Sequence, residues 1–123
     1  MPTILPILLV DDDTDIRAVM RRTLAAQGYR ITEAGDGIAA FDSARRDPPA
    51  LIVLDLGLPG QDGWAVAQQI RAEPPLEAVP ILVITAHDCG PARAVAQAVG
   101  CQAVLQKPFA LTTLEHTIAR LLA

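Results

Sequence analysis

The chain has 123 residues, 51% of them hydrophobic, and its 14 acidic and 10 basic side chains give a formal net charge of −4. This length fits one domain, residues 1–123, that can fold alone. The scattered arginines exclude the basic footprint of a nucleic-acid-binding surface, so we expect no contact with DNA or RNA. The apolar run at 4–10 is far shorter than the roughly 20 residues of a membrane span. We therefore expect no membrane contact and a cytoplasmic location.

The chain has two cysteines, Cys89 and Cys101, which are too few for a disulfide framework. We expect free thiols in a reducing compartment. Together with His87 and His116 they are residue types that bind zinc, but their spacing matches no zinc-binding motif. The sequence therefore predicts no zinc site.

Short apolar runs alternate with longer segments of helical period along the chain. This alternation is typical of repeated strand–helix units around a parallel sheet. The continuous apolar character of the first run predicts a strand buried on both faces. The expected strands are residues 7–10, 29–33, 51–54, 80–84 and 103–105.

The first two expected helices have clear start and stop signals. The first begins after an N-cap at Asp13 or Thr14 and ends at Gly28. The second follows the turn 35–37 and ends before the prolines at 48–49. The inner faces of these helices are expected to carry Ile16, Met20 and Leu24 in the first, and Ile38, Phe41 and Ala44 in the second.

Three more helices complete the pattern. A loop at 57–63 leads to a helix that is stopped by the prolines at 74–75. For the fourth helix, Pro91 suits the first turn, the stretch 92–99 is weakly amphipathic, and Gly100 closes the helix. The fifth opens with a capping-box pattern at 112–115. Their expected inward residues are Val66 and Ile70 in the third helix, and Leu114, Ile118 and Leu121 in the fifth.

Polar residues that can bind ions or react lie at the ends of the apolar runs. Asp11 and Asp12 follow the first strand, Asp55 follows the third, Thr85 ends the fourth, and Lys107 follows the fifth. In a doubly wound sheet of order 2-1-3-4-5, the first and third strands are neighbours at the switch point, where ligands bind. We therefore expect the three carboxylates to converge there.

Three crowded carboxylates repel one another unless a cation lies between them. A hard, oxygen-preferring ion such as Mg²⁺ removes this conflict and neutralises a phosphoryl group in transfer. The hydroxyl of Thr85 and the ammonium of Lys107, the only lysine in the chain, can bind phosphoryl oxygens. One carboxylate is then the nucleophile. The set predicts a phosphoryl-acceptor site.

The chain resembles the response-regulator receiver domain, the CheY-like module of two-component signalling, over essentially its whole length. The resemblance implies a flavodoxin-like (βα)5 fold with helices on both faces of the sheet. It also implies a phosphorylation-controlled switch rather than a conventional enzyme. The segments that carry it, in order and with family-like spacing, are Leu9–Asp12, Val53–Leu56, Leu58–Gly63, Ile84–Ala86 and Lys107–Phe109.

The resemblance implies a role for each carboxylate. Asp55 would take a phosphoryl group from the phosphohistidine of a sensor histidine kinase or a histidine phosphotransfer protein, and the domain would slowly hydrolyse it. Asp12 and Asp55, with the backbone carbonyl of Gly57, would bind Mg²⁺ or Mn²⁺, and Asp11 would assist through water.

The resemblance also implies roles for the two remaining site residues. Thr85 would move toward the phosphoryl oxygens and Lys107 would pair with them. The Lys107–Pro108 bond is expected to be cis.

The output side of the switch departs from the family pattern. Receivers usually carry an aromatic residue three positions before the lysine, where this chain has Val104. Our hypothesis is that phosphorylation is read through the loop after Thr85, or by a partner that touches the site. His87 at the rim of the site is a candidate for controlling water access. The implied docking face for a downstream protein consists of the fourth helix, the fifth strand and the fifth helix.

Three other interpretations compete with this one. A HAD-type phosphatase would use Asp11, but Asp15 stands where that family has threonine. A pseudo-receiver would bind partners without phosphorylation, although all the site positions are filled. A calcium loop starting at Asp11 is excluded because Ile16 replaces the required glycine. Both a stand-alone receiver and a receiver within a longer regulator fit this sequence.

Overall fold

The computed structural model describes residues 4–123 and has a five-stranded parallel sheet as its middle layer. The strand order is β2-β1-β3-β4-β5, which confirms the predicted topology. The expected domain bounds, 1–123, include three residues outside the described range. The strands are β1 (Pro6–Val10), β2 (Arg30–Ala34), β3 (Leu51–Asp55), β4 (Ile81–Thr85) and β5 (Ala103–Gln106).

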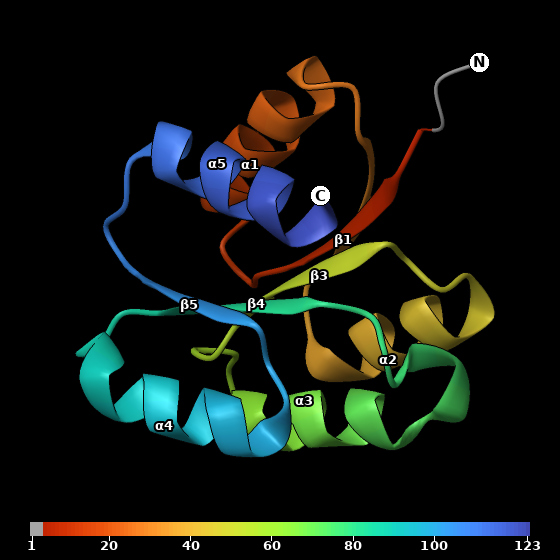
Figure 1. Cartoon of the computed structure of the whole chain (residues 1–123), viewed down its shortest axis with the longest axis vertical. Coiled ribbons are helices and arrows are strands. Elements are labelled where there is room, and N and C mark those ends of the chain that lie inside the picture. Colours follow the sequence, from red (N-terminus) through yellow and green to blue (C-terminus); the bar gives the residue numbers. More distant parts are fainter. Residues whose placement is uncertain (1–3) are drawn as a thin grey trace.

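Helices cover both faces of the sheet. Helices α1 and α5 lie on one face, and α2, α3 and α4 lie on the other (Figure 1). None of the helices within residues 4–123 has the length and apolar character needed to cross a membrane. The helices are α1 (Thr14–Ala26), α2 (Gly37–Arg46), α3 (Gly63–Ala72), the short 3-10 helix η1 (Pro74–Leu76), α4 (Cys89–Val99) and α5 (Leu111–Leu122).

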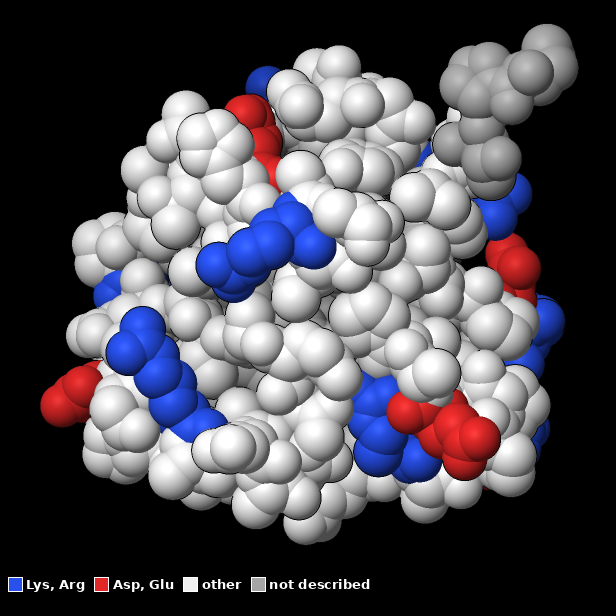
Figure 2. Space-filling model, viewed as in Figure 1, with Lys and Arg blue, Asp and Glu red and all other residues white. Residues whose placement is uncertain are grey.

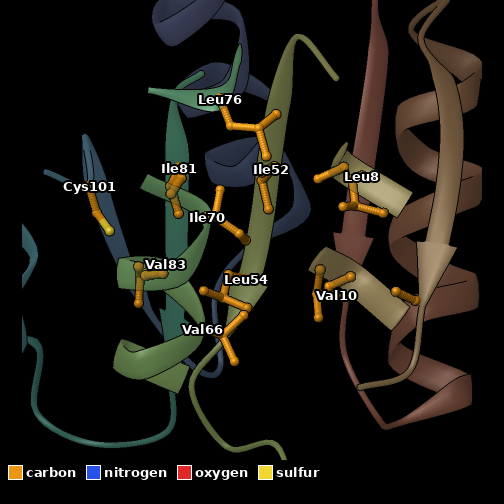
Figure 3. Packing of buried hydrophobic residues seen from close by; sticks show 14 of the residues in the cluster. Leu8, Val10, Ile52, Leu54, Val66, Ile70, Leu76, Ile81, Val83 and Cys101 are labelled. Atoms are coloured by element: carbon orange, nitrogen blue, oxygen red, sulfur yellow. The ribbon is translucent and has the colours of Figure 1, made fainter. Parts of the chain in front are cut away.

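The buried strands divide their side chains between two cores. Successive side chains of a strand point to opposite faces, so a fully apolar strand serves both helix layers. In β4, Ile81 and Val83 pack toward α3, whereas Leu82 and Ile84 pack toward α1 and α5. Figure 3 shows the first core, where Ile52 and Leu54 of β3 lie beside Val66 and Ile70 of α3, and Leu8 and Val10 of β1 belong to the same cluster.

The register of the central strands brings the predicted site residues to one edge. Val10 of β1 pairs with Leu54 of β3, so the next residue on each strand, Asp11 and Asp55, lie side by side. Asp55 in turn pairs with Ile84 of β4. The carboxyl ends of β1, β3 and β4 therefore form one polar edge.

The expected inward face of the second helix was partly wrong. Ile38 is 69% exposed, while Gly37, Ala40 and Ala44 are buried. A Cβ atom at Gly37 would lie 2.5 Å from Cγ2 of Val66. Because α2 approaches α3 this closely, its inner face holds glycine and alanine rather than isoleucine.

The predicted capping box of the fifth helix was also wrong. Helix α5 begins one residue before Thr112, and its N-cap, Ala110, makes no side-chain hydrogen bond. Aspartates cap the other four α-helices instead, including Asp13, one of the two predicted N-caps of α1. The fourth helix starts at Cys89, earlier than predicted, and ends as expected at Gly100, which has a φ of 94°.

Candidate functional site

Three polar side chains are buried at the carboxyl edge of the sheet. Asp11 after β1 is 0% exposed, Asp55 at the end of β3 is 5% exposed, and Thr85 at the end of β4 is 3% exposed. Burying a carboxylate is unfavourable unless hydrogen bonds and an opposite charge compensate for the lost water. Their surroundings must therefore supply both.

Lys107, after β5, provides the opposite charge. Its Nζ donates hydrogen bonds to Oδ2 of Asp11 at 3.2 Å and to Oδ2 of Asp55 at 3.0 Å. The backbone N–H of Lys107 donates to the carbonyl of Thr85 at 2.7 Å, which ties the lysine to β4. The Lys107–Pro108 bond is cis, as expected.

Backbone groups hold the other oxygens of the two buried carboxylates. Oδ1 of Asp11 accepts from the N–H of Asp13 at 2.9 Å, and Oδ1 of Asp55 accepts from the N–H of Gly57 at 2.9 Å. Each buried carboxylate thus has one oxygen on a backbone amide and the other on Lys107.

Burial and the neighbouring charges perturb the acid–base properties of this cluster. Burial raises the pKa of Asp11 above its ordinary value of 3.8, and the charge of Asp55 raises it further, against the opposing effects of the Asp13 amide and Lys107. Burial alone would lower the pKa of Lys107, but its hydrogen bonds and charge pairing with Asp55 and Asp11 outweigh burial and raise it. Lys107 is therefore held as an ammonium ion.

The third predicted carboxylate, Asp12, is exposed but joins the same cluster. Carboxylate oxygens of Asp11, Asp12 and Asp55 all lie within 4.8 Å of one another. Magnesium binds oxygen ligands at about 2.1 Å, which places opposite ligands roughly 4 Å apart. The cluster holds three carboxylates and one ammonium, which pairs with Asp11 and Asp55, so the oxygen donors, their spacing and their net negative charge fit a divalent cation.

The zinc-type residues are not gathered in the same way. Within residues 4–123, the three aspartates form the one group of at least three His, Cys, Asp or Glu side chains with this spacing. Cys89 and Cys101 are free thiols.

A cavity of about 690 Å³ opens above the cluster. His87 lies on its wall, as predicted, and its backbone N–H donates to Oγ1 of Thr85 at 3.0 Å. Because this bond uses the oxygen of Thr85 as an acceptor, the hydroxyl proton remains available for a ligand. Other lining residues are Asp11, Asp12, Asp13, Asp55, Leu56, Gly57, Asp62, Trp64, Ala86, Asp88, Pro91, Ala92, Val95 and Lys107.

Two supporting residues were missed by the sequence analysis. Nη1 of Arg17 donates to the backbone carbonyl of Asp11 at 2.6 Å. Oε1 of Gln61 accepts from the N–H of Gly37, which ties the loop after Asp55 to the start of α2. Arg17 had a weak sequence signal, since a basic residue in the second turn of a helix can reach back to the preceding loop, whereas Gln61 had none.

The surface charge agrees with the scattered arginines of the sequence. On the face shown in Figure 2, basic side chains form separate patches among uncharged atoms.

The sheet order and the carboxylate–lysine cluster define a flavodoxin-like α/β domain whose site lies at the switch point.

Comparison with known proteins gives the family. The family model for the response regulator receiver domain matches residues 7–119 of the sequence. The chain therefore belongs to the response-regulator receiver family of two-component systems. Response regulator MprA of Mycobacterium leprae (strain TN) is 40% identical over 117 residues, which are 95% of this chain and 49% of that protein. MprA of Mycobacterium tuberculosis (strain ATCC 25618 / H37Rv) gives the same values. The chain spans about half the length of these curated relatives.

Solved structures agree with the family and the fold. Chemotaxis protein CheY4 of Vibrio cholerae superposes with a TM-score of 0.91 at 29% identity, covering 97% of this chain and 99% of that one. The receiver domain of sensor histidine kinase PA1611 from Pseudomonas aeruginosa PAO1 gives 0.87 at 33% identity, covering 98% of each chain. That structure holds a magnesium ion in its active site cleft. Receiver domains are generally signalling modules rather than enzymes.

Proposed function

We propose that Asp55 accepts a phosphoryl group from the phosphohistidine of a sensor histidine kinase or histidine phosphotransfer protein. The phosphorylated domain then changes its binding to a downstream protein. The observation that carries this proposal is the position of Asp55, which lines an open cavity. One of its carboxylate oxygens accepts a hydrogen bond from Lys107, and the other accepts one from the Gly57 amide.

The proposed transfer exchanges one bond to phosphorus for another. A carboxylate oxygen of Asp55 attacks phosphorus, and a P–O bond forms as the P–N bond to the donor imidazole breaks. The imidazole leaves with the electron pair of that bond. The ammonium of Lys107 and the hydroxyl of Thr85 bind the phosphoryl oxygens as their charge shifts. Attack of water on phosphorus later breaks the bond to Asp55, releases inorganic phosphate and restores the carboxylate. His87 at the cavity wall is the proposed control of water access.

A divalent cation belongs to this proposal. Asp12, Asp55 and the carbonyl of Gly57 would hold Mg²⁺ or Mn²⁺, with Asp11 assisting through water. The bound ion would neutralise charge on the phosphoryl oxygens during transfer. The spacing of the three carboxylates supports this assignment, and so does the magnesium ion in the PA1611 receiver domain.

The signal is proposed to leave through the loop after Thr85. Val104, without an aromatic ring to turn, belongs to the same buried cluster as Ala96 of α4. The bond from the His87 amide to Thr85 gives the loop direct contact with the site. The downstream partner is proposed to bind the face of α4, β5 and α5. The test compares the backbone amide chemical shifts of wild type and Val104→Tyr before and after phosphorylation. Identical shift changes in α4 of the two proteins would count against the hypothesis.

Intact-protein mass spectrometry tests the acceptor. Wild type and Asp55→Asn are incubated with Mg²⁺ and acetyl phosphate, and a hydrolysable gain of one phosphoryl group is expected in wild type alone. No gain in a chain that still binds Mg²⁺ would favour the pseudo-receiver. A gain that survives Asp55→Asn would favour phosphatase-like use of Asp11.

We further propose that the chain acts in the cytoplasm as one receiver domain. The two free thiols suit a reducing compartment, and a kinase phosphohistidine would meet the domain there.

A further inference from the structure

Arg17 in the second turn of α1 connects the site to the end of β2. Its side chain is 18% exposed. Nη1 donates to the backbone carbonyl of Asp11 at 2.6 Å, and Nε donates to Oε1 of Glu33 at 3.0 Å. The guanidinium is therefore held by a carboxylate on one side while it holds a backbone carbonyl on the other.

The surroundings of Arg17 are shaped for this bridge. A Cβ atom at Gly35 would lie 3.2 Å from Nη1, so the absence of a side chain there leaves room for the guanidinium. Arg21, one turn further along α1, also contacts Glu33, at 3.4 Å. Both arginines contact Glu33. Among the hydrogen bonds of residues 4–123, however, Arg17 donates to the backbone carbonyl of Asp11 and Arg21 does not.

The carbonyl that Arg17 holds belongs to the peptide bond between Asp11 and Asp12. A peptide bond is planar, so fixing its oxygen fixes the direction in which the chain continues to Asp12. The carboxylate of Asp11 is anchored by Asp13 and Lys107, whereas none of the hydrogen bonds found within residues 4–123 involves the exposed carboxylate of Asp12. The direction of Asp12 therefore depends on its backbone.

We propose that Arg17 is a positioning residue for the cation site. By holding the Asp11–Asp12 peptide bond, it presents the Asp12 carboxylate to the cation beside Asp55. This inference rests on the proposed function, because it concerns the affinity of the same carboxylates for Mg²⁺. Loss of the groups that orient metal ligands typically weakens metal binding by about 10- to 100-fold.

If Arg17 acted only through its positive charge, its replacement would change the affinity for Mg²⁺ in the opposite direction. Removing a positive charge near a cation site strengthens cation binding, by an amount that salt screens. Replacing Arg17 with an uncharged residue should therefore tighten Mg²⁺ binding if the arginine acts only through its charge. A positioning role predicts weaker binding, so the direction of the change separates the two effects.

The test is calorimetric titration of the metal-free chain with MgCl₂. Arg17→Met keeps an unbranched stem and removes the hydrogen bonds, and we expect its dissociation constant for Mg²⁺ to rise about 10-fold. The matched control is Arg21→Met, which loses the same charge on the same helix and should bind Mg²⁺ as wild type does, or slightly more tightly. Arg17→Lys, which can still donate to the Asp11 carbonyl, should recover part of the affinity.

Gly35→Ala provides a second variant with no change of charge. Its Cβ would press on the guanidinium of Arg17, and we expect weaker Mg²⁺ binding by a smaller factor than in Arg17→Met. Unchanged or tighter binding in both Arg17→Met and Gly35→Ala would overturn the inference. Equal weakening in Arg21→Met would overturn it as well. Absence of Mg²⁺ binding in wild type would refute the cation site itself, a result that is distinct from the first two.

Discussion

The two ends of the sheet hold their partly buried cations in different ways. At the carboxyl end, the ammonium of Lys107 lies between the carboxylates of Asp11 and Asp55. At the amino end, Arg71 of α3 faces neutral oxygens: Nη1 donates to the carbonyls of Leu76 and Glu77 at 2.9 and 2.7 Å, and Nη2 to that of Gly100 at 2.9 Å.

This difference separates the amino end, where the cation stabilises the fold, from the carboxyl end, where the cation belongs to the site. Through Nη1 and Nη2, Arg71 joins α3 to the segments that lead into β4 and β5, whereas its buried Nε has no hydrogen-bond partner within residues 4–123. At the other end, Lys107 pairs with two of the three clustered carboxylates, and a bound cation would relieve the excess negative charge. Substitutions at the amino end should therefore change stability, and those at the carboxyl end should change chemistry.

The largest expected effect is on phosphorylation in Lys107→Met. Removing the ammonium takes away the group that would bind the incoming phosphoryl oxygens, and we expect the initial rate with acetyl phosphate to fall about 100-fold. Time-resolved intact-protein mass spectrometry measures this rate. Arg71→Met, assayed where it is fully folded, is the control and should react at the wild-type rate. A Lys107→Met rate close to wild type would remove the chemical distinction between the two ends.

Arg71→Met should lower the free energy of unfolding by about 2 kcal/mol. Its hydrogen bonds to three backbone carbonyls would be lost, leaving those oxygens without this donor. Urea denaturation of the metal-free protein measures the change. If Arg71→Met unfolds at the wild-type midpoint, the amino end is not held together by this arginine.

Magnesium should stabilise the folded chain through the carboxyl end alone. A ligand that binds only the folded state adds about 1.4 kcal/mol at a free concentration about ten times its dissociation constant. We expect this gain in wild type and in Arg71→Met, and a smaller gain in Asp12→Asn at the same Mg²⁺ concentration. Denaturation with and without Mg²⁺ gives all three values. An equal gain in Asp12→Asn would place the cation away from Asp12.

The smallest effect concerns Cys101, just before β5 at the amino end. Burial raises the pKa of its thiol above the ordinary value of 9.0, against a lowering by Arg71. Above about pH 9 the unfolded chain then loses this proton more readily than the folded chain does, so the thiol's contribution to stability falls as pH rises. Between about pH 8 and pH 10, the stability of Cys101→Ala should decline less steeply than that of wild type. Parallel curves would show that the thiol titrates alike in both states.

Much of the fold could be predicted because parallel strands buried on both faces must be apolar along their length. The runs at 7–10 and 51–54 stop where a carboxylate begins, so the strand ends and the catalytic candidates were marked by the same change in polarity. Helix ends were also readable where proline or glycine stops the helix, as at Gly100.

The errors have a common origin in contacts between distant segments. Ile38 was expected inside because it is apolar, but the close approach of α2 to Val66 admits only small residues on that face. The capping-box pattern at 112–115 was locally plausible, yet α5 begins one residue earlier, after Ala110. A local pattern describes what a segment can do, and the neighbouring element decides which option is used.

The sequence by itself determined that short apolar strands end in aspartates, a threonine and a lysine, because burial and periodicity are properties of each segment alone. The tertiary structure decided which of these groups touch. The bond from Lys107 to Asp11 joins residues 96 positions apart, and the reach of Arg17 to the Asp11 carbonyl depends on the space beside Gly35. Hydrogen bonds depend on distances of tenths of an ångström, and only the packed chain sets those distances.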